Sequence, residues 1–355
     1  MKLLRPISIL VSCLIWTAGA TAQISLSPPG AQAPPAASKS AKPKAKPAAA
    51  KKPAATRTPA TTPAPAATAT PAPLPDDPNA DPVFAAYQRG MYKTAFDLAT
   101  KRAQATGDPK AMTMLGELYA NALGVKRDDA RAADWYKRAS DGGDREGMFA
   151  LAMLRLGGRG GPVDREEAVK LLASSAKLGN PKAAYNLALL YLDGQTLPQD
   201  LKRAAELLRI AADAGNPEAQ YALATFYKEG TGVEKDIDKA VRLLQAASLA
   251  DNVDAEVEYA IALYNGTGTP RNEAAAVALL RKAARQNSPI AQNRLARVLV
   301  SGQGAPVDKI EGLKWHIVAK TAGRGDPMLD EALAELSKED RAKAEAAARK
   351  WLGIR

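Results

Sequence analysis

Cysteine, histidine and aromatic residues are scarce in this 355-residue chain. It has one cysteine, Cys13, and one histidine, His316, and aromatic residues make up 5% of it. A zinc site would therefore depend on carboxylates almost alone. A Ser–His pair would have to use His316, and no G-x-S-x-G sequence is present. We expect no metal, no cofactor and no enzymatic activity.

Three further patterns resemble sites but have a simpler explanation. The segment 157–161, Gly-Gly-Arg-Gly-Gly, lacks the Lys-Ser/Thr and the preceding strand of a phosphate-binding loop, and we expect a loop between helices there. The acid pair Glu166-Glu167 falls at a helix start, where the helix dipole favours carboxylates. His316 shares its place in a repeat with Leu172 and Leu208, so we expect it on a packed helix face.

The basic charge of the chain is concentrated near its beginning. The net charge is +11, to which residues 1–22 contribute two bases and residues 23–75 contribute seven bases, with no acid in either segment. Removing these bases leaves about +2 for residues 76–355. A region so nearly neutral lacks the compact basic patch that follows nucleic-acid phosphates. We expect no nucleic-acid partner.

Residues 1–22 have the pattern of a secretory signal peptide. Bases precede a short apolar run from Ile7 to Ala18, and Ala20-Thr-Ala22 offers a small-x-small cleavage site. The run is shorter than the roughly 20 apolar residues that span a bilayer, so we expect no transmembrane helix in the mature chain. The chain is expected to be exported, either periplasmic or secreted. Cys13, after Leu10-Val-Ser, leaves open a lipoprotein signal.

Residues 23–80 form a linker rich in proline, alanine and lysine. Such a segment has too little apolar bulk to offset the entropy lost on ordering, and we expect it to be disordered. Its bases could make weak contact with an anionic cell wall or membrane surface. Alternatively, the segment is a soluble spacer that its own charges keep open.

From residue 110 onward the sequence repeats every 36 residues. One register contains Ala111, Gly147, Ala183, Ala219, Ala255 and Ala291, with leucine or tyrosine four places later. Another contains Ala132, Ala168, Ala204, Ala240, Ala276 and Gly312, with tryptophan or leucine three places later. Registers that keep one spacing over six copies indicate a repeat array.

Each repeat has the parts of an antiparallel helix pair, with apolar residues at helical spacing. A positive φ is expected in the loop between the helices, where glycine recurs as Gly124, Gly160, Gly232, Gly268 and Gly304, with Thr196 as the exception. The N-caps expected for the second helix are Asp128, Asp164, Asp200, Asp236, Asn272 and Asp308. The second helix is expected to end at a residue in the left-handed conformation, which in the six repeats is Gly143, Gly179, Gly215, Asp251, Asn287 and Gly323.

Stacked helix pairs bury apolar faces that a single pair leaves exposed. We therefore predict an all-α protein, a right-handed superhelical solenoid of antiparallel helix pairs. Residues 81–109 are expected to form a degenerate leading helix pair, residues 110–326 six repeats, and residues 327–355 the C-terminal capping helices. In the last segment, Ser337 to Asp340 resembles a capping box.

The repeat resembles a known family. The segment Ala183-Ala-Tyr-Asn-Leu-Ala-Leu-Leu-Tyr191, followed by Pro198-x-Asp200 and Gly215-Asn-Pro217, is similar to the SEL-one-like repeats, a subclass of tetratricopeptide-type helix pairs with a longer loop. The resemblance covers about residues 110–326. It implies a scaffold that binds proteins, and exported bacterial members of the family often act in envelope organisation, signalling control or host contact.

By analogy with tetratricopeptide arrays, the first helix of each repeat lines the concave face and presents its non-core residues to a partner. The candidate partner-binding residues are Tyr185, Asn186, Tyr221, Thr225, Glu258, Asn293, Arg294 and Arg297. We predict a non-catalytic interaction scaffold or regulator in the periplasm or cell envelope. The alternatives are a cell-wall or polysaccharide binder that uses the basic tail, or an enzyme that acts on the cell wall.

Overall fold

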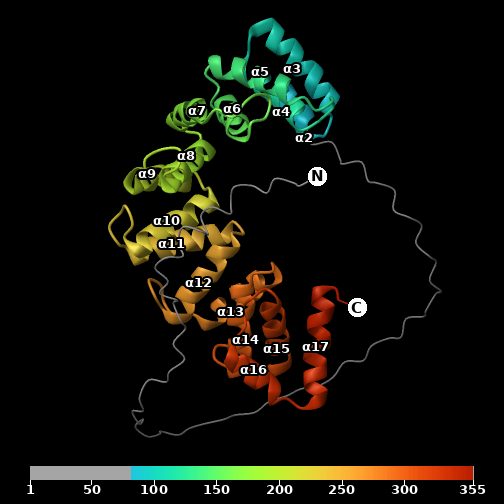
Figure 1. The fold of residues 1–355 in the computed structure, drawn as a ribbon, viewed down its shortest axis with the longest axis vertical. Coiled ribbons are helices and arrows are strands. Elements are labelled where there is room, and N and C mark those ends of the chain that lie inside the picture. The colour runs from blue at the N-terminus through green and yellow to red at the C-terminus, as the bar shows by residue number, and fades with distance from the viewer. Residues whose placement is uncertain (1–80, 355) are drawn as a thin grey trace, which may run out of the picture. The chain divides into compact units, whose positions relative to one another are not determined.

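The computed structural model describes residues 81–354, and the chain is helical throughout that range, without β-strands (Figure 1). The helices are α2 (Pro82–Gln88), α3 (Tyr92–Thr106), α4 (Pro109–Ala120), α5 (Asp129–Asp141), α6 (Arg145–Gly157), α7 (Arg165–Lys177), α8 (Pro181–Asp193), α9 (Leu201–Asp213), α10 (Pro217–Glu229), α11 (Ile237–Leu249), α12 (Val253–Asn265), α13 (Glu273–Arg285), α14 (Pro289–Ser301), α15 (Lys309–Thr321), α16 (Pro327–Ala334) and α17 (Lys338–Leu352). The prediction of an all-α fold is confirmed.

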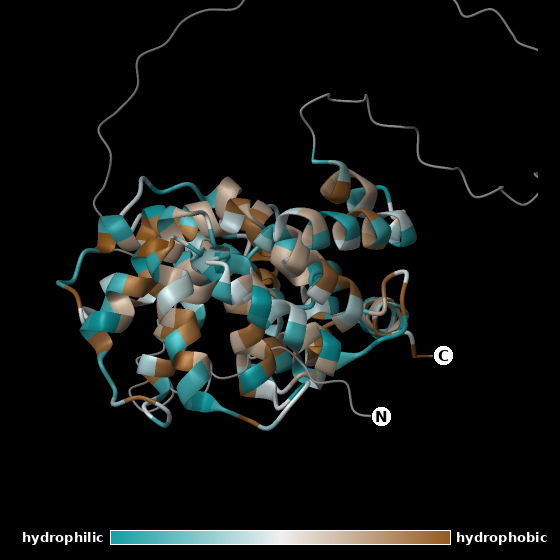
Figure 2. Ribbon diagram, turned by 90° about the horizontal axis from the view of Figure 1, so that it is seen from above, coloured by the Kyte–Doolittle hydropathy of each residue, from teal (hydrophilic) through white to brown (hydrophobic). Residues whose placement is uncertain are grey.

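The helices from α4 to α15 pack as consecutive pairs. We call the first helix of each pair an A helix (α4, α6, α8, α10, α12 and α14) and the second a B helix (α5, α7, α9, α11, α13 and α15). Each A helix packs on the B helix that follows it, and each B helix packs on the next A helix. Figure 2 shows apolar and polar residues alternating along these helices, as expected where one face of each helix is buried. The predicted solenoid of helix pairs is confirmed.

A polar side chain caps the start of every helix in the array. Asp128 accepts a hydrogen bond from the amide of Arg131 at 3.0 Å, and Asp200 accepts one from Arg203 at 2.8 Å. The other predicted caps, Asp164, Asp236, Asn272 and Asp308, make the same contact. The A helices are capped by Asp108, Asp144, Asn180, Asn216, Asn252 and Ser288. Since each cap contributes about 1 kcal/mol, these residues fix where the helices begin.

One backbone hydrogen bond closes the loop between each A helix and its B helix. The amide of the B-helix cap donates to a carbonyl near the end of the A helix, as from Asp200 to Tyr191 at 3.2 Å and from Asp236 to Tyr227 at 2.9 Å. The five predicted loop glycines all have positive φ, and the predicted left-handed ends of the B helices are confirmed, including Asp251 at φ 60°.

The loop glycines also lie against the preceding helix pair, and two of them approach its backbone most closely. A Cβ atom at Gly160 would lie 2.1 Å from the carbonyl oxygen of Asp129, and one at Gly232 would lie 2.4 Å from that of Leu201. Any side chain there would clash with the first turn of the preceding B helix. Glycine therefore serves both the turn and the contact between repeats.

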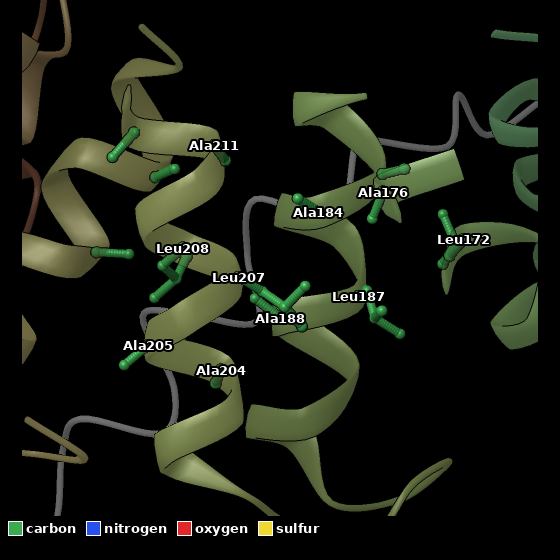
Figure 3. Packing of buried hydrophobic residues seen from close by; sticks show 14 of the residues in the cluster. Leu172, Ala176, Ala184, Leu187, Ala188, Ala204, Ala205, Leu207, Leu208 and Ala211 are labelled. Carbon is green, nitrogen blue, oxygen red and sulfur yellow. The ribbon is translucent and has the colours of Figure 1, made fainter. Parts of the chain in front are cut away.

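Leucine and alanine fill the interior of the array. Figure 3 shows leucines of three successive helices, Leu172, Leu187 and Leu207, among alanines such as Ala188 and Ala204. These two alanines have no exposed surface. A methyl side chain lets the helix backbones approach closely, while the leucines supply the apolar area that stabilises the stack.

Different contacts complete the two ends of the described region. At one end, α2 packs on α3, and α3 packs on α4. At the other end, α17 packs on α15. The rings of Trp315 and Trp351 meet there edge to face, with their centroids 4.9 Å apart. Ser337 caps α17 by accepting a hydrogen bond from the amide of Asp340 at 3.1 Å, as predicted.

The predicted signal peptide at residues 1–22, with its Cys13, and the predicted linker at residues 23–80 lie outside the described residues. Within residues 81–354, no helix combines the length and the apolar character needed to span a membrane.

Candidate protein-binding face

The eight predicted partner-binding residues lie on A helices in three registers of the repeat. Tyr185, Tyr221 and Asn293 share the first register, Asn186, Glu258 and Arg294 the second, and Thr225 and Arg297 the third. All eight are half-buried. One face of the A helices thus carries all of them, and we call it the A-helix face.

The residues on α8 and α10 make contacts within their own helices. The amide of Asn186 donates to the carbonyl of Lys182 at 2.8 Å, and the hydroxyl of Thr225 donates to the carbonyl of Tyr221 at 3.2 Å. Burial, followed by the charge of Glu218, raises the pKa of the Tyr185 phenol. This phenol therefore stays protonated and can act as a hydrogen-bond donor.

The structure brings acidic residues of α12 toward α10. Glu258 forms an ion pair with Lys228 at 3.1 Å. Burial and then the charge of Glu258 raise the pKa of the Asp254 carboxyl. Burial, followed by the charges of Asp254 and Glu258, raises the pKa of the Tyr221 phenol. This part of the A-helix face is acidic, with a protonated phenol beside two carboxyl groups.

Two of the three residues on α14 contact the cap of the helix that follows the array. Arg297 Nε and Asn293 Nδ2 donate to the same carboxylate oxygen of Asp326, at 2.5 and 3.2 Å. Asp326 is 3% exposed and caps α16. Burial and then the charge of Arg297 lower the pKa of Arg294. The side chains of Asn293 and Arg297 thus hold α16 in place.

A groove lies beside α4 and α6, the A helices of the first two repeats, and residues of the same three registers line it. Its lining includes Thr113 and Phe149 from the first register, Met114 and Ala150 from the second, and Glu117 from the third. Its volume is about 600 Å³. Helix α2 completes it with Val83, Phe84 and Tyr87. We call this depression the α2–α6 groove.

Sequence reasoning missed the α2–α6 groove. The three registers could have been continued back to residues 113, 114 and 117, which would have pointed to α4 and α6. No register predicts the part played by α2, because that helix lies before the repeats. The groove forms because α2, which lies outside the repeats, packs beside the repeat helices α4 and α6.

The described region offers little for catalysis or metal binding. His316 is fully buried, as its register predicts, and its Nε2 lies 2.8 Å from the Asp330 carboxylate. Among residues 81–354, no three His, Cys, Asp or Glu side chains come close enough to hold a metal ion.

A family model described as Sel1 repeat matches the whole array. It matches six consecutive segments, residues 109–144, 145–180, 181–216, 217–252, 253–288 and 289–323. Each match begins at the first residue of an A helix. The repeat unit found by the model is therefore the helix pair seen in the structure.

Two solved structures are similar in sequence and in fold. A Sel1 repeat protein from Oxalobacter formigenes is 26% identical, with a TM-score of 0.59; the match covers 68% of this chain and 98% of that protein. The antigen c5321 of uropathogenic Escherichia coli, which displays an SLR fold, is also 26% identical, with a TM-score of 0.54. That match covers 74% of this chain and 64% of the antigen, so the chain spans less than two thirds of the antigen's length. No curated protein matches the chain.

Proposed function

This chain belongs to the Sel1 repeat family, and from that premise we propose that it is a scaffold of the bacterial cell envelope that binds partner proteins on its A-helix face. Sel1 repeat proteins are typically interaction scaffolds without enzymatic activity. Stacked helix pairs give such proteins extended surfaces on which a partner can be bound across several repeats.

The α2–α6 groove is the observation that carries this proposal. The groove has a volume of about 600 Å³, which leaves room for side chains of a partner. Aromatic residues are enriched among those that dominate binding energy, and the groove contains Phe84, Tyr87 and Phe149. Phe84 of α2, which lines the groove beside the A helices α4 and α6, is 50% exposed and so is accessible to a partner.

The envelope location rests on the signal-like pattern of residues 1–22. On this proposal the mature chain is periplasmic or secreted, and the basic segment 23–75 contributes at most weak contacts with anionic wall or membrane surfaces. Of the eight residues predicted from sequence, those on α8, α10 and α12 (Tyr185, Asn186, Tyr221, Thr225 and Glu258) would continue the binding face beyond the groove, whereas Asn293 and Arg297 are engaged with Asp326.

Affinity capture from a cell-envelope extract tests this proposal. The bait is the exported chain, compared with a version that lacks residues 23–75, at low and high salt. We expect both versions to retain the same discrete protein at high salt, since packed apolar contacts are little screened by ions. If only the version with residues 23–75 retains material, and salt removes it, the basic segment is the binder and the scaffold proposal is wrong.

A further inference from the structure

The A helices α10 and α12 carry an excess of acidic residues. Glu256 of α12 is fully buried and pairs with Lys282 of α13 at 2.7 Å, so its charge is taken up inside the array. The remaining charged residues of the two helices are exposed or half-buried, and they are four acids and one base: Glu218, Glu229, Asp254, Glu258 and Lys228. The surface of these two helices is therefore negative.

Most of these surface acids have no partner within the chain. Glu258 pairs with Lys228 at 3.1 Å. Within residues 81–354, the carboxylates of Glu218, Glu229 and Asp254 form neither an ion pair nor a side-chain hydrogen bond. Three carboxylates are thus available to a ligand.

The neighbouring A helices do not cancel this charge. Helix α8 has one acid and one base and is neutral. On α14, the guanidinium of Arg297 is held by Asp326, which leaves Arg294 as the base that α14 adds. When Arg294 is counted together with Lys228, the four acids still outnumber the bases by two.

Tyr221 of α10 lies among these acids. Burial is the largest of the causes that raise the pKa of its phenol, and the others are the charges of Asp254, Glu258 and Glu229. Within residues 81–354 its hydroxyl forms no hydrogen bond. A half-buried aromatic ring bordered by carboxylates offers a cation both an opposite charge and a flat surface on which to lie.

The spacing of the two acids of α12 favours arginine as that cation. Asp254 and Glu258 are four residues apart, so they lie on one face of the helix, and like charges at this spacing repel. A guanidinium placed between them would relieve the repulsion. Its planar set of N–H groups can bond two carboxylates and stack on the ring of Tyr221, whereas a lysine ammonium is a compact and strongly hydrated charge.

We propose that the A-helix face of α10 and α12 binds an arginine-rich segment of a partner protein, with guanidinium groups between Asp254 and Glu258 and against the ring of Tyr221. This inference rests on the proposed function and names the chemistry of the partner. Opposite charges determine which segments bind, and the contact with the aromatic ring adds affinity.

The basic segment of this chain has a different composition from the expected ligand. Residues 23–75 contain six lysines and one arginine, and they contain no aromatic residue. A face that prefers guanidinium groups therefore favours a segment of another protein.

Fluorescence anisotropy with defined peptides tests the inference on the full chain. The probe is a fluorescein-labelled peptide of about ten residues with several arginines among alanine and glutamine. Two matched peptides replace the arginines by lysine or by glutamine. We expect the arginine probe to bind at least about tenfold more tightly than the glutamine peptide and about threefold more tightly than the lysine peptide, and its affinity to fall as salt is raised.

Four variants and one matched control locate the probe. Asp254→Asn and Glu258→Gln should each weaken binding about fivefold, and Tyr221→Leu about threefold. Lys228→Gln should strengthen binding about threefold, because Glu258 loses its partner within the chain. Asp238→Asn is the control, because Asp238 is also an exposed acid without an ion pair in the described region but lies on the B helix α11. It should change binding less than about twofold, and circular dichroism of each variant shows that the helices remain folded.

Three results would overturn the inference: equal binding of the arginine and glutamine peptides, equal effects of Asp254→Asn and Asp238→Asn, or no binding of the arginine probe. A chain that lacks residues 23–75 tests the other source of bases. If it binds the probe about threefold or more tightly than the full chain, and Asp254→Asn abolishes this gain, residues 23–75 compete for the face and the assignment to a partner protein is wrong.

Capture from an envelope extract separates this inference from the proposed function. If a partner is recovered that Asp254→Asn and Glu258→Gln still retain, the inference is wrong while the scaffold proposal stands. If no version captures a partner, the scaffold proposal itself fails.

Discussion

Replacing Gly232 by alanine should destabilise the array far more than replacing Gly215. Both glycines have positive φ, at 65° and 84°. At Gly215 a Cβ atom would meet nothing within 4 Å, whereas at Gly232 it would lie 2.4 Å from the carbonyl oxygen of Leu201. Gly215→Ala therefore measures the cost of backbone conformation alone, and Gly232→Ala adds the cost of separating two repeats.

The two costs can be worked out separately. A non-glycine residue in the left-handed region loses about 1–2 kcal/mol. Forcing an extra methyl group into a tight contact costs about 1–3 kcal/mol more. We therefore expect a loss of about 1–2 kcal/mol of unfolding free energy for Gly215→Ala and about 2–5 kcal/mol for Gly232→Ala.

Urea unfolding followed by circular dichroism measures both losses. Because a repeat array can unfold in parts, the comparison is made on the early part of the transition as well as on its midpoint. Equal losses in the two variants would refute the idea that the loop glycines are needed for contact between repeats. No loss in Gly215→Ala would refute the conformational part of the reasoning.

Three further predictions concern the C-terminal end. Asp326→Ala should cost about 1–3 kcal/mol in urea unfolding, because Arg297 and Asn293 lose their shared acceptor and α16 loses its cap; a loss no greater than for an exposed surface aspartate would contradict this. Burial raises the pKa of the Asp326 carboxyl, but the hydrogen bonds of Arg297 and Asn293 outweigh it and hold the pKa below its ordinary value. The unfolding free energy of wild type should therefore exceed that of Asp326→Asn by its full amount above about pH 5, and this difference should shrink as pH falls below about 4. A difference that grows in acid would mean that the pKa of Asp326 is raised rather than lowered. Trp351→Ala should release α17 from Trp315 at a cost of about 1–2 kcal/mol, seen as a change in Trp315 fluorescence and faster hydrogen exchange in α17, and an unchanged exchange rate would show that α17 is held by other contacts.

Local structure could be predicted from the sequence because local residue chemistry determines it. Position alone predicts Asp200 and Asn272 as caps, since a short polar side chain before an apolar helix can accept a hydrogen bond from a free amide of the first turn. The repeat register predicts left-handed helix ends at Asp251 and Asn287 although neither is glycine, because each occupies the position of a glycine in other repeats. Both predictions are confirmed by the φ values of 60° and 63°.

Contacts between repeats could not be predicted in the same way. The positive φ of Gly232 follows from its place in the loop, but its approach to Leu201 depends on how one helix pair stacks on the next. The hydrogen bonds of Asn293 and Arg297 to Asp326 join residues about 30 positions apart, and no periodicity relates α16 to the repeats. The α2–α6 groove is a third example, because it needs a helix that lies outside the periodic region.

Site-specific photocrosslinking in the producing cell tests the central claim most directly. A photoreactive p-benzoylphenylalanine is placed at Phe84 or Glu146 in the α2–α6 groove, and at Leu249, which ends the B helix α11 and is 80% exposed. If the A-helix face binds a partner, the two groove positions will form an adduct with the same discrete protein and Leu249 will form none. An adduct at Leu249 with none in the groove, or the same adduct at all three positions, would contradict the account.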